Sequence, residues 1–394
     1  MTTQAHGAAP AVTAPAVVPQ RSEIRAFAAA DVPAVARLFK TTFRPGDDVP
    51  LPAVETYLRD LFIDGPDFHA ASPSLVHVTA AGHVSGFVGS LSQPMTVNGR
   101  AVRAAHACSL MVADPKQDSL AGARLLRSFV GSAPDLAFSE TSSALSRRMW
   151  TRLGGRAVSA FSMKWLRVLR PAGAAITFAA RRWRALGALH PLGAFADRVV
   201  ANKLGETWWD VPPAPDGYST TPVEGDAAVS LITDLSSRFA LRPAWSAAHL
   251  AGRLAHAAYM PAFGDLVCAK VTDRDGAPAG AFLYHVRRNG LATVLQILAR
   301  ENAADGVVAG LIRDAHARGA VALAGRCEPS ILEALLQANC VILQRGSTTV
   351  HSRDPEVLAA IAKGDAMLTG LAGEAWSQLI GGLTARPHPG PAAA

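Results

Sequence analysis

The stretch Ser109–Leu126, with the sequence SLMVADPKQDSLAGARLL, indicates the fold more clearly than any other part of the chain. It opens with an apolar, strand-like run and continues through a polar loop. Leu125 and Leu126, followed by Phe129 and Val130, recur with the period of an amphipathic helix. The stretch therefore predicts a strand, a loop and a helix that lies on a sheet.

A diverged copy of this order follows in the second half of the chain. Gly86 in SGFVGSL corresponds to Gly280 in AGAFLYHV, 194 residues later. The Asn98-Gly99 pair, which is typical of a tight β-hairpin, returns 191 residues later as Asn289-Gly290. Strand-like LQIL (295–298) again precedes a loop and an apolar-periodic helix. We interpret this as an internal duplication, which predicts an α/β protein with two domains, each built on a mixed (α+β) sheet.

The composition suits such a protein. The chain has 394 residues, 49% hydrophobic and 18% charged, which excludes a disordered, collagen-like or coiled-coil chain. No apolar run reaches the roughly 18 residues of a membrane-spanning helix. The four cysteines are Cys108, Cys268, Cys327 and Cys340. They have neither the spacing of a zinc site nor that of a disulfide framework. We therefore expect no metal and a cytoplasmic location.

The positive charge is concentrated in one segment. Residues 161–203 contain eight lysines and arginines and one acid, Asp197. The net charge of this segment is therefore +7, the same as that of the whole chain. The arginines Arg181, Arg182 and Arg184 flank a tryptophan in this segment. They suit an anionic membrane surface, an RNA, or a pair of helices that bridges the domains. No aromatic-interleaved nucleic-acid motif accompanies them, which disfavours a nucleic-acid partner.

These observations divide the chain into five parts. We expect disordered tails at both ends, two folded domains, and a basic helical connector between them. The ranges are 1–20 for the first tail, 21–165 for the first domain, 166–215 for the connector, 216–385 for the second domain and 386–394 for the last tail.

The first half resembles the GNAT acyltransferase superfamily. Val112-Ala113-Asp114-Pro115 begins that family's cofactor motif and Leu125-Leu126 ends it, with alanines at two glycine positions and Asp118 where the family has Arg or Gln. The resemblance implies that loop amides and the helix dipole bind the pyrophosphate of acetyl-CoA or another acyl-CoA. Asp118 would put a negative charge beside that phosphate unless it turns away. The cofactor contacts implied are Leu110, Met111, Val112, Ser119, Leu120, Ala121, Gly122 and Ala123.

A second resemblance lies in Met149–Gly155. It is similar to the family's L-Y-x-x-L-G-F, in which the tyrosine often protonates the departing thiolate. Trp150 stands at the tyrosine position, and an indole N–H does not serve as that acid near neutral pH. This part of the resemblance supports the fold rather than the reaction.

The resemblance implies an acyl-CoA-dependent N- or O-acyltransferase whose acceptor is the amine of a small molecule or a protein. His106 and Glu140, at the ends of two predicted strands, are candidates for the base that deprotonates the amine. Two other functions stay open. One is a pseudoenzyme that keeps the scaffold as a binding module, favoured by Asp118 and Trp150. The other is transfer from aminoacyl-tRNA, as in Fem-type tandem GNAT proteins.

The second half holds one further candidate. Arg326, His351 and Arg353 could together bind an anionic group, for example on an acceptor. The alternative is a solvated loop with ion pairs to neighbouring acids.

Overall fold

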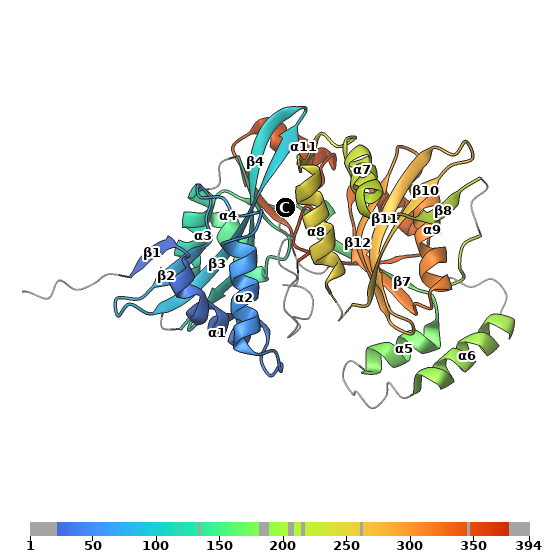
Figure 1. Ribbon diagram of the computed structural model, residues 1–394, viewed down its shortest axis with the longest axis horizontal. Helices are drawn as coiled ribbons and strands as arrows, with labels where there is room; N and C mark the ends of the chain where they lie inside the picture. The colour runs from blue at the N-terminus through green and yellow to red at the C-terminus, as the bar shows by residue number, and fades with distance from the viewer. Residues whose placement is uncertain are drawn as a thin grey trace, which may run out of the picture.

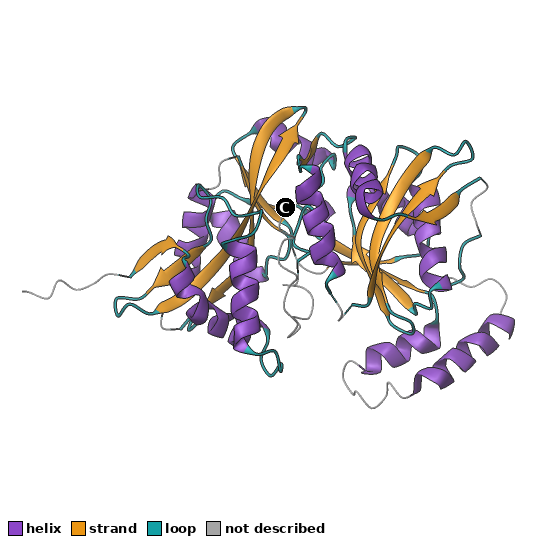
Figure 2. Ribbon diagram, viewed as in Figure 1, coloured by secondary structure: helices purple, strands orange, loops and turns teal. Residues whose placement is uncertain are grey.

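The computed structural model describes two mixed sheets flanked by helices (Figures 1 and 2). The α/β class expected from the sequence is confirmed. The described residues are 22–116, 118–132, 135–180, 189–203, 209–213, 217–260, 263–344 and 347–377. Both expected tails, 1–20 and 386–394, lie outside them.

The first sheet has the strand order β1-β2-β3-β4-β5-β15-β6, with β9 added to β3. Its strands are β1 (Glu23–Ala26), β2 (Leu75–Val78), β3 (Val84–Val97), β4 (Arg100–Val112), β5 (Leu136–Ser139), β6 (Arg156–Ala157), β9 (Leu241–Pro243) and β15 (Thr349–Ser352). β3 and β4 form a long hairpin closed by Asn98 and Gly99, which have φ of 49° and 83°. These positive values match the two-residue turn that the Asn-Gly pair predicts.

The second sheet has the order β14-β7-β13-β12-β11-β10-β8. Its strands are β7 (Met163–Val168), β8 (Ser219–Pro222), β10 (Asp265–Thr272), β11 (Pro278–Val286), β12 (Leu291–Ala299), β13 (Ala322–Arg326) and β14 (Val341–Gln344). Asn289-Gly290 lies in the four-residue connection between β11 and β12, and only Asn289 has a positive φ, 56°. The second Asn-Gly pair thus sits in a longer turn than the first.

The two halves exchange strands. β7 straddles the expected boundary between the first domain and the connector, at residues 165 and 166, and it pairs with β13 and β14 in the second sheet. β15 belongs to the second half of the sequence, yet it lies between β5 and β6 in the first sheet. The exchange crosses the expected ranges 21–165 and 216–385. Their standing as separate domains stays a prediction.

Helices cover both faces of each sheet. On the first sheet, α1 (Val32–Phe43) and α2 (Leu51–Phe62) pack on the face that carries Phe87, while α3 (Ala121–Ser132) and α4 (Ala144–Arg152) pack on the face that carries Val88. Successive strand residues point to opposite faces, which explains the split. The second sheet is covered by α7 (Gly225–Ser236) and α8 (Ala247–Ala258) on one face, and by α9 (Ala304–Ala317) and α10 (Leu332–Gln337) on the other.

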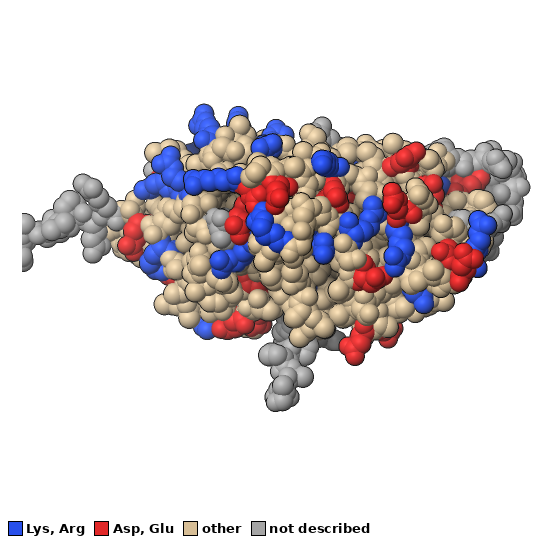
Figure 3. All heavy atoms as spheres, turned by 90° about the horizontal axis from the view of Figure 1, so that it is seen from above, with Lys and Arg blue, Asp and Glu red and all other residues tan. Residues whose placement is uncertain are grey.

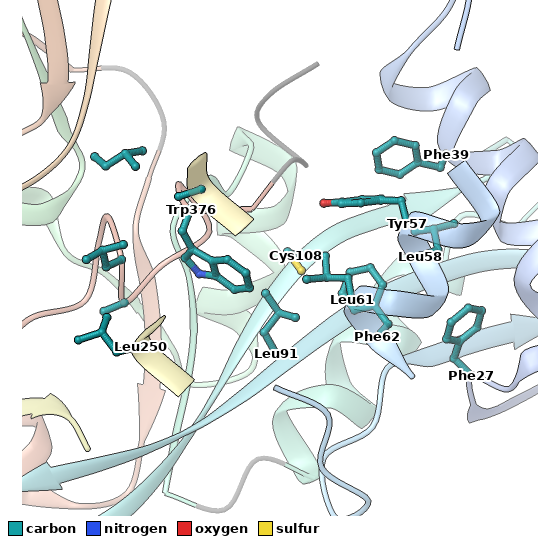
Figure 4. Close-up of a cluster of buried hydrophobic side chains, with 14 of the residues drawn as sticks. Phe27, Phe39, Tyr57, Leu58, Leu61, Phe62, Leu91, Cys108, Leu250 and Trp376 are labelled. Carbon is teal, nitrogen blue, oxygen red and sulfur yellow. The ribbon is translucent and has the colours of Figure 1, made fainter. Parts of the chain in front are cut away.

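One hydrophobic core joins the halves. It contains Phe62 and Leu61 of α2, Leu250 of α8, and Trp376 of the C-terminal segment, residues 365–377 (Figure 4). That segment follows α11 (Pro355–Lys363) and runs between the two sheets. The core therefore positions the C-terminal segment against both halves.

The connector forms two helices, α5 (Pro171–Ala180) and α6 (His190–Lys203), which lie below the second sheet in Figure 1. The Asp197 carboxylate of α6 accepts hydrogen bonds from the backbone N–H of Ala172 (2.7 Å) and Gly173 (2.9 Å) at the start of α5. A carboxylate is favourable at a helix N-terminus, so the lone acid of the basic segment fixes the helix pair. Arg181, Arg182 and Arg184 lie outside the described residues.

Charges elsewhere are mixed. On the face shown in Figure 3, lysines and arginines are interspersed with acids. Within the described part of the chain, no helix has both the length and the apolar character needed to cross a membrane.

A buried ion pair holds the C-terminal segment in place. Arg253 of α8 and Asp67, in the loop after α2, are 2.5 Å apart, with 2% and 1% of their side chains exposed. The Arg253 guanidinium also donates to the Leu371 carbonyl and stacks on Trp245 and Trp376, 4.9 and 4.6 Å from the ring centres. Burial acts to raise the pKa of Asp67, but Arg253 and His249 outweigh it and hold this pKa below its usual value.

We expect Arg253→Met to lower the free energy of unfolding by about 3–5 kcal/mol, because it leaves the Asp67 carboxylate buried without its partner. Urea denaturation at pH 7 measures this. The double variant Asp67→Leu/Arg253→Met should recover much of the loss, since it removes both charges. Equal stability of wild type and Arg253→Met would contradict the assignment.

Candidate functional site

The candidate site is the gap where β4 and β5 separate. The two parallel strands pair only between Ala104–His106 and Leu136–Phe138. Further along, β4 carries a bulge in which Ser109 has a φ of 52° and Ser109 and Leu110 together oppose one residue of β3. The bulge turns the end of β4 away from its neighbour. A cleft of about 390 Å³ opens there.

One wall of the cleft comes from the stretch that indicated the fold. Of the expected cofactor contacts, Leu110, Met111, Val112, Ser119 and Gly122 line the cleft, whereas Leu120, Ala121 and Ala123 do not. Leu120 has 64% of its surface exposed to solvent and Ala121 is buried. The backbone N–H groups of Gly122 and Ala123, in the first turn of α3, make no hydrogen bond to any described residue. They are therefore available to an anionic ligand.

Asp118 turns its charge toward an arginine. Its Oδ2 accepts from Nη2 of Arg124 at 2.6 Å and lies 3.4 Å from Nε2 of His77, while Oδ1 accepts from the Leu120 N–H. The carboxylate still lines the cleft. Because Arg124 neutralises it, Asp118 is compatible with a phosphate nearby.

Trp150 is part of the core. It is 1% exposed and packs edge-on against Phe129, with the ring centres 6.3 Å apart. Its indole forms part of the cleft floor, beside Met149 and Leu126. This position explains why an indole can replace a phenol here without loss of packing.

Buried polar groups gather behind the inner end of the cleft, which is lined by Cys108 and Thr141. The Thr141 hydroxyl donates to Oε1 of Glu374, from the C-terminal segment, at 2.5 Å. Ligand-type atoms of His106, Cys108 and Glu374 lie within 4.8 Å of one another, all buried. Figure 4 shows Cys108 between Trp376 of the C-terminal segment and Leu61 of α2.

The two predicted catalytic residues lie in this group. His106 sits within β4, which is longer than the predicted strand, and its Nε2 accepts from the Glu140 N–H at 3.3 Å. Complete burial lowers the pKa of His106 to about 3, so its ring is neutral near pH 7. Glu140 follows β5 as expected, and its Oε1 accepts from Nε of Arg326 at 3.0 Å. Its Oε2 accepts from the Glu374 N–H at 2.8 Å.

Glu374 is a candidate functional residue that sequence reasoning missed. Burial first, and then the negative charge of Glu140, raise its pKa to about 7. A carboxyl group with this pKa can accept a proton near neutral pH. The available signal was an acid within the apolar run LTGLAGEAW (368–376), since acids in such runs are rarely buried without a reason.

The cluster of His106, Cys108 and Glu374 is better suited to proton transfer than to binding a metal ion. The Glu140 N–H directed at Nε2 places the His106 proton on Nδ1, which has no partner among the described residues. A protonated nitrogen cannot bind a metal, and Arg326 and Arg253 are close enough to lower the pKa of His106. We therefore assign no metal here, and the expected absence of a metal stays a prediction.

The expected anion-binding cluster is divided. Arg326 joins Glu140, with its Nη2 donating to the Glu140 carbonyl at 2.6 Å. His351 and Arg353 line another pocket, at the end of β15. The three residues do not form one site.

Comparison with solved structures shows the fold. An Enterococcus faecalis V583 protein described as a probable N-acyltransferase matches with a TM-score of 0.54 and 10% identity, over 84% of this chain and 72% of that one. A GCN5-related N-acetyltransferase from Kribbella flavida matches with a TM-score of 0.53 and 12% identity, over 87% of this chain and 74% of that one. Another, from Anabaena variabilis, matches with a TM-score of 0.55 and 11% identity, over 85% of this chain and 73% of that one. This chain therefore has the GNAT fold, an acyltransferase fold, as the sequence resemblance predicted. No protein-family model matches the chain, and no curated protein matches it.

The cleft can be tested at Gly122. A Cβ there would lie 3.4 Å from Val112 and 4.0 Å from Met149, so a larger residue fits the backbone but extends into the cleft. We expect Gly122→Trp to abolish stabilisation by acetyl-CoA, which for wild type should reach ~2.7 kcal/mol at 100 times the dissociation constant. Thermal unfolding measures the difference.

Gly252→Trp is the matched control, because Gly252 is exposed on α8, lines neither the cleft nor another described pocket, and a Cβ there would meet nothing within 4 Å. It should respond to acetyl-CoA as wild type does. Loss of the response in both variants, or in neither, would show that the cleft is not the binding site.

Proposed function

We propose that this chain transfers an acyl group from acetyl-CoA or another acyl-CoA to the amine of a small molecule or a protein. The observation that carries the proposal is the buried Glu374 carboxyl, with a pKa of about 7, held by Thr141 at the inner end of the β4–β5 cleft. Bound acyl-CoA would supply the acyl group as a thioester. The amine nitrogen gains the acyl carbon, the carbon–sulfur bond breaks, and CoA leaves as a thiolate that water protonates.

The residues of this chain would divide the work. Ser119 and the Gly122 amide, which line the cleft, would hold the pyrophosphate at the start of α3, and the Ala123 amide follows in the same helical turn. Glu374 would take the proton from the acceptor amine, directly or through one water, and Thr141 orients its carboxylate. We assign the base to Glu374 in preference to His106 and Glu140. His106, which stays neutral, and Glu140, which binds the Glu374 N–H, would act as positioning residues.

The second half would shape the acceptor side. Arg326 of β13 reaches the Glu140 carboxylate, and the C-terminal segment brings Glu374. Alignment of amine and thioester contributes much of the rate in such a reaction, up to ~7–11 kcal/mol. The exchanged strands and the shared core provide the rigid frame for that alignment.

The base can be tested with Glu374→Gln, which keeps the shape and the Thr141 contact. We expect kcat/KM of wild type to rise with pH through about 7, where Glu374 loses its proton. The variant should be at least roughly 100-fold slower and should lose this rise. Steady-state kinetics from pH 5.5 to 8.5 with acetyl-CoA and a panel of amines provide the measurement.

The stability of Glu374→Gln shows whether a loss of activity comes from a lost base or from a poorly folded chain. Because the pKa of Glu374 is higher in the folded chain, stability is lost as pH rises from the unfolded value near 4.5 toward 7. Glu374→Gln should therefore be more stable than wild type at pH 8, and this gain should shrink toward pH 5.

Glu328→Gln is the control: Glu328 also has a pKa of about 7, but it binds Gln296 and Thr369, so activity should persist. An unchanged kcat/KM in Glu374→Gln would exclude Glu374 as the base that deprotonates the amine.

Two other functions remain open from the sequence. A pseudoenzyme would bind acyl-CoA weakly or not at all, and its rates would not respond to Glu374→Gln. Transfer from aminoacyl-tRNA would show as RNA that copurifies with the chain and is released steeply by salt.

A membrane surface is a second candidate partner. Asp197 and the close contact of Gly193 with Ile176 hold one face of α6 on α5. Leu192 and Phe195 lie on another face, 65% and 66% exposed. Together with the net charge of +7 in residues 161–203, this apolar face supports docking of the connector on an anionic bilayer.

We expect the wild-type chain to float with vesicles that contain 30% phosphatidylglycerol, and less so as salt is raised. Leu192→Glu/Phe195→Glu should remain in the unbound fraction. Leu336→Glu, at another exposed leucine (54%), is the matched control and should float. Failure of the wild-type chain to float would remove this partner.

A further inference from the structure

A second pocket, of about 610 Å³, lies where the two halves exchange a strand. Its walls are the C-terminal half of α3, the end of α4, β15 and the first residues of α11. It shares no lining residue with the β4–β5 cleft. The expected pyrophosphate site is at the start of α3, and Val130 of this pocket is nine residues further on, about 13 Å along the helix axis.

Three nitrogen-bearing side chains surround this pocket, each from a different segment. Arg127 comes from α3, His351 from β15, and Arg353 from the turn before α11. Neither arginine makes a hydrogen bond or an ion pair with any described residue, although carboxylates lie in the same pocket. His351 is half-buried, and burial, followed by the charge of Arg353, lowers its pKa.

The acids of the pocket are already engaged. The Asp354 carboxylate accepts from the Glu356 N–H at the start of α11 and from Arg100. Asp135 accepts from the Arg103 N–H at 2.8 Å, and its backbone carbonyl accepts from the Ser352 hydroxyl at 2.6 Å. Among the described residues, neither acid forms an ion pair with Arg127 or Arg353. The two arginines are left to an external anion.

We propose that this pocket binds a small phosphorylated molecule, whose phosphate is held by Arg127, Arg353 and His351. Guanidinium groups match the oxygens of a phosphate with paired hydrogen bonds, and an imidazole adds a further donor. A volume of about 610 Å³ is within the range for small-molecule sites, so the pocket has room for more than the phosphate alone.

The site depends on the strand exchange. Arg127 belongs to the first half of the sequence, whereas His351 and Arg353 belong to the second. A ligand that contacts all three would join α3 to β15 and so stabilise the exchanged arrangement. The inference does not rest on acyl transfer, and it holds for a pseudoenzyme as well.

Inorganic pyrophosphate is the probe, titrated into the full chain at low ionic strength by isothermal calorimetry. Wild type should show saturable binding, and the component at this pocket should persist when the start of α3 is obstructed. Arg127→Ala and Arg353→Ala should each weaken it roughly tenfold or more, as expected for loss of a charge-assisted hydrogen bond. Both residues are exposed, so folding should be unaffected, which thermal unfolding checks.

Two controls locate the site. Arg37→Ala removes one exposed cation of α1, outside the pocket, and should leave the affinity unchanged. Gly122→Trp obstructs the cleft and should also leave it unchanged. Binding that does not saturate, that weakens equally in Arg37→Ala, or that disappears in Gly122→Trp would overturn the proposal.

Discussion

Glu140 connects the parts of this protein that have to meet. It follows β5 of the first sheet, accepts from Arg326 of the second sheet, and accepts from the backbone of Glu374 in the C-terminal segment. A Cβ at Gly373 would come within 2.0 Å of its Oε2, so only glycine lets the segment approach so closely. A buried carboxylate with this many partners is stable only when all of them are in place.

The strand exchange follows from the same arrangement. With β7 in the second sheet and β15 in the first, Arg326 at the end of β13 contacts Glu140, the residue after β5. Arg253 and Asp67 fix the segment from the other side. The first half thus forms the cleft, while the second half and the C-terminal segment supply its inner end.

Sequence patterns predicted the features of the fold that depend on residues close together in the chain. The stretch 109–126 predicted a strand, loop and helix, and Asn98-Gly99 predicted a tight turn, because each depends on residues close in the chain. The exchange of β7 and β15 could not be predicted, because strands of only six and four residues do not specify their partners. Glu374 was missed for a related reason: its pKa depends on Glu140, which lies 234 residues earlier.

Glu328 and Glu374 are two buried glutamates with the same raised pKa and different hydrogen-bond partners. Both have a pKa of about 7, so both cost stability at neutral pH. Glu328 offsets part of that cost, because Gln296 and Thr369 donate to its two oxygens and the Leu371 N–H donates in turn to Gln296. The negative charge of Glu140 raises the pKa of both glutamates, but Glu374 accepts a side-chain hydrogen bond only from Thr141 among the described residues, at the cleft wall. A neutral side chain would be more stable in this place above pH 7, but it could not take a proton from an amine, which is the role proposed for Glu374.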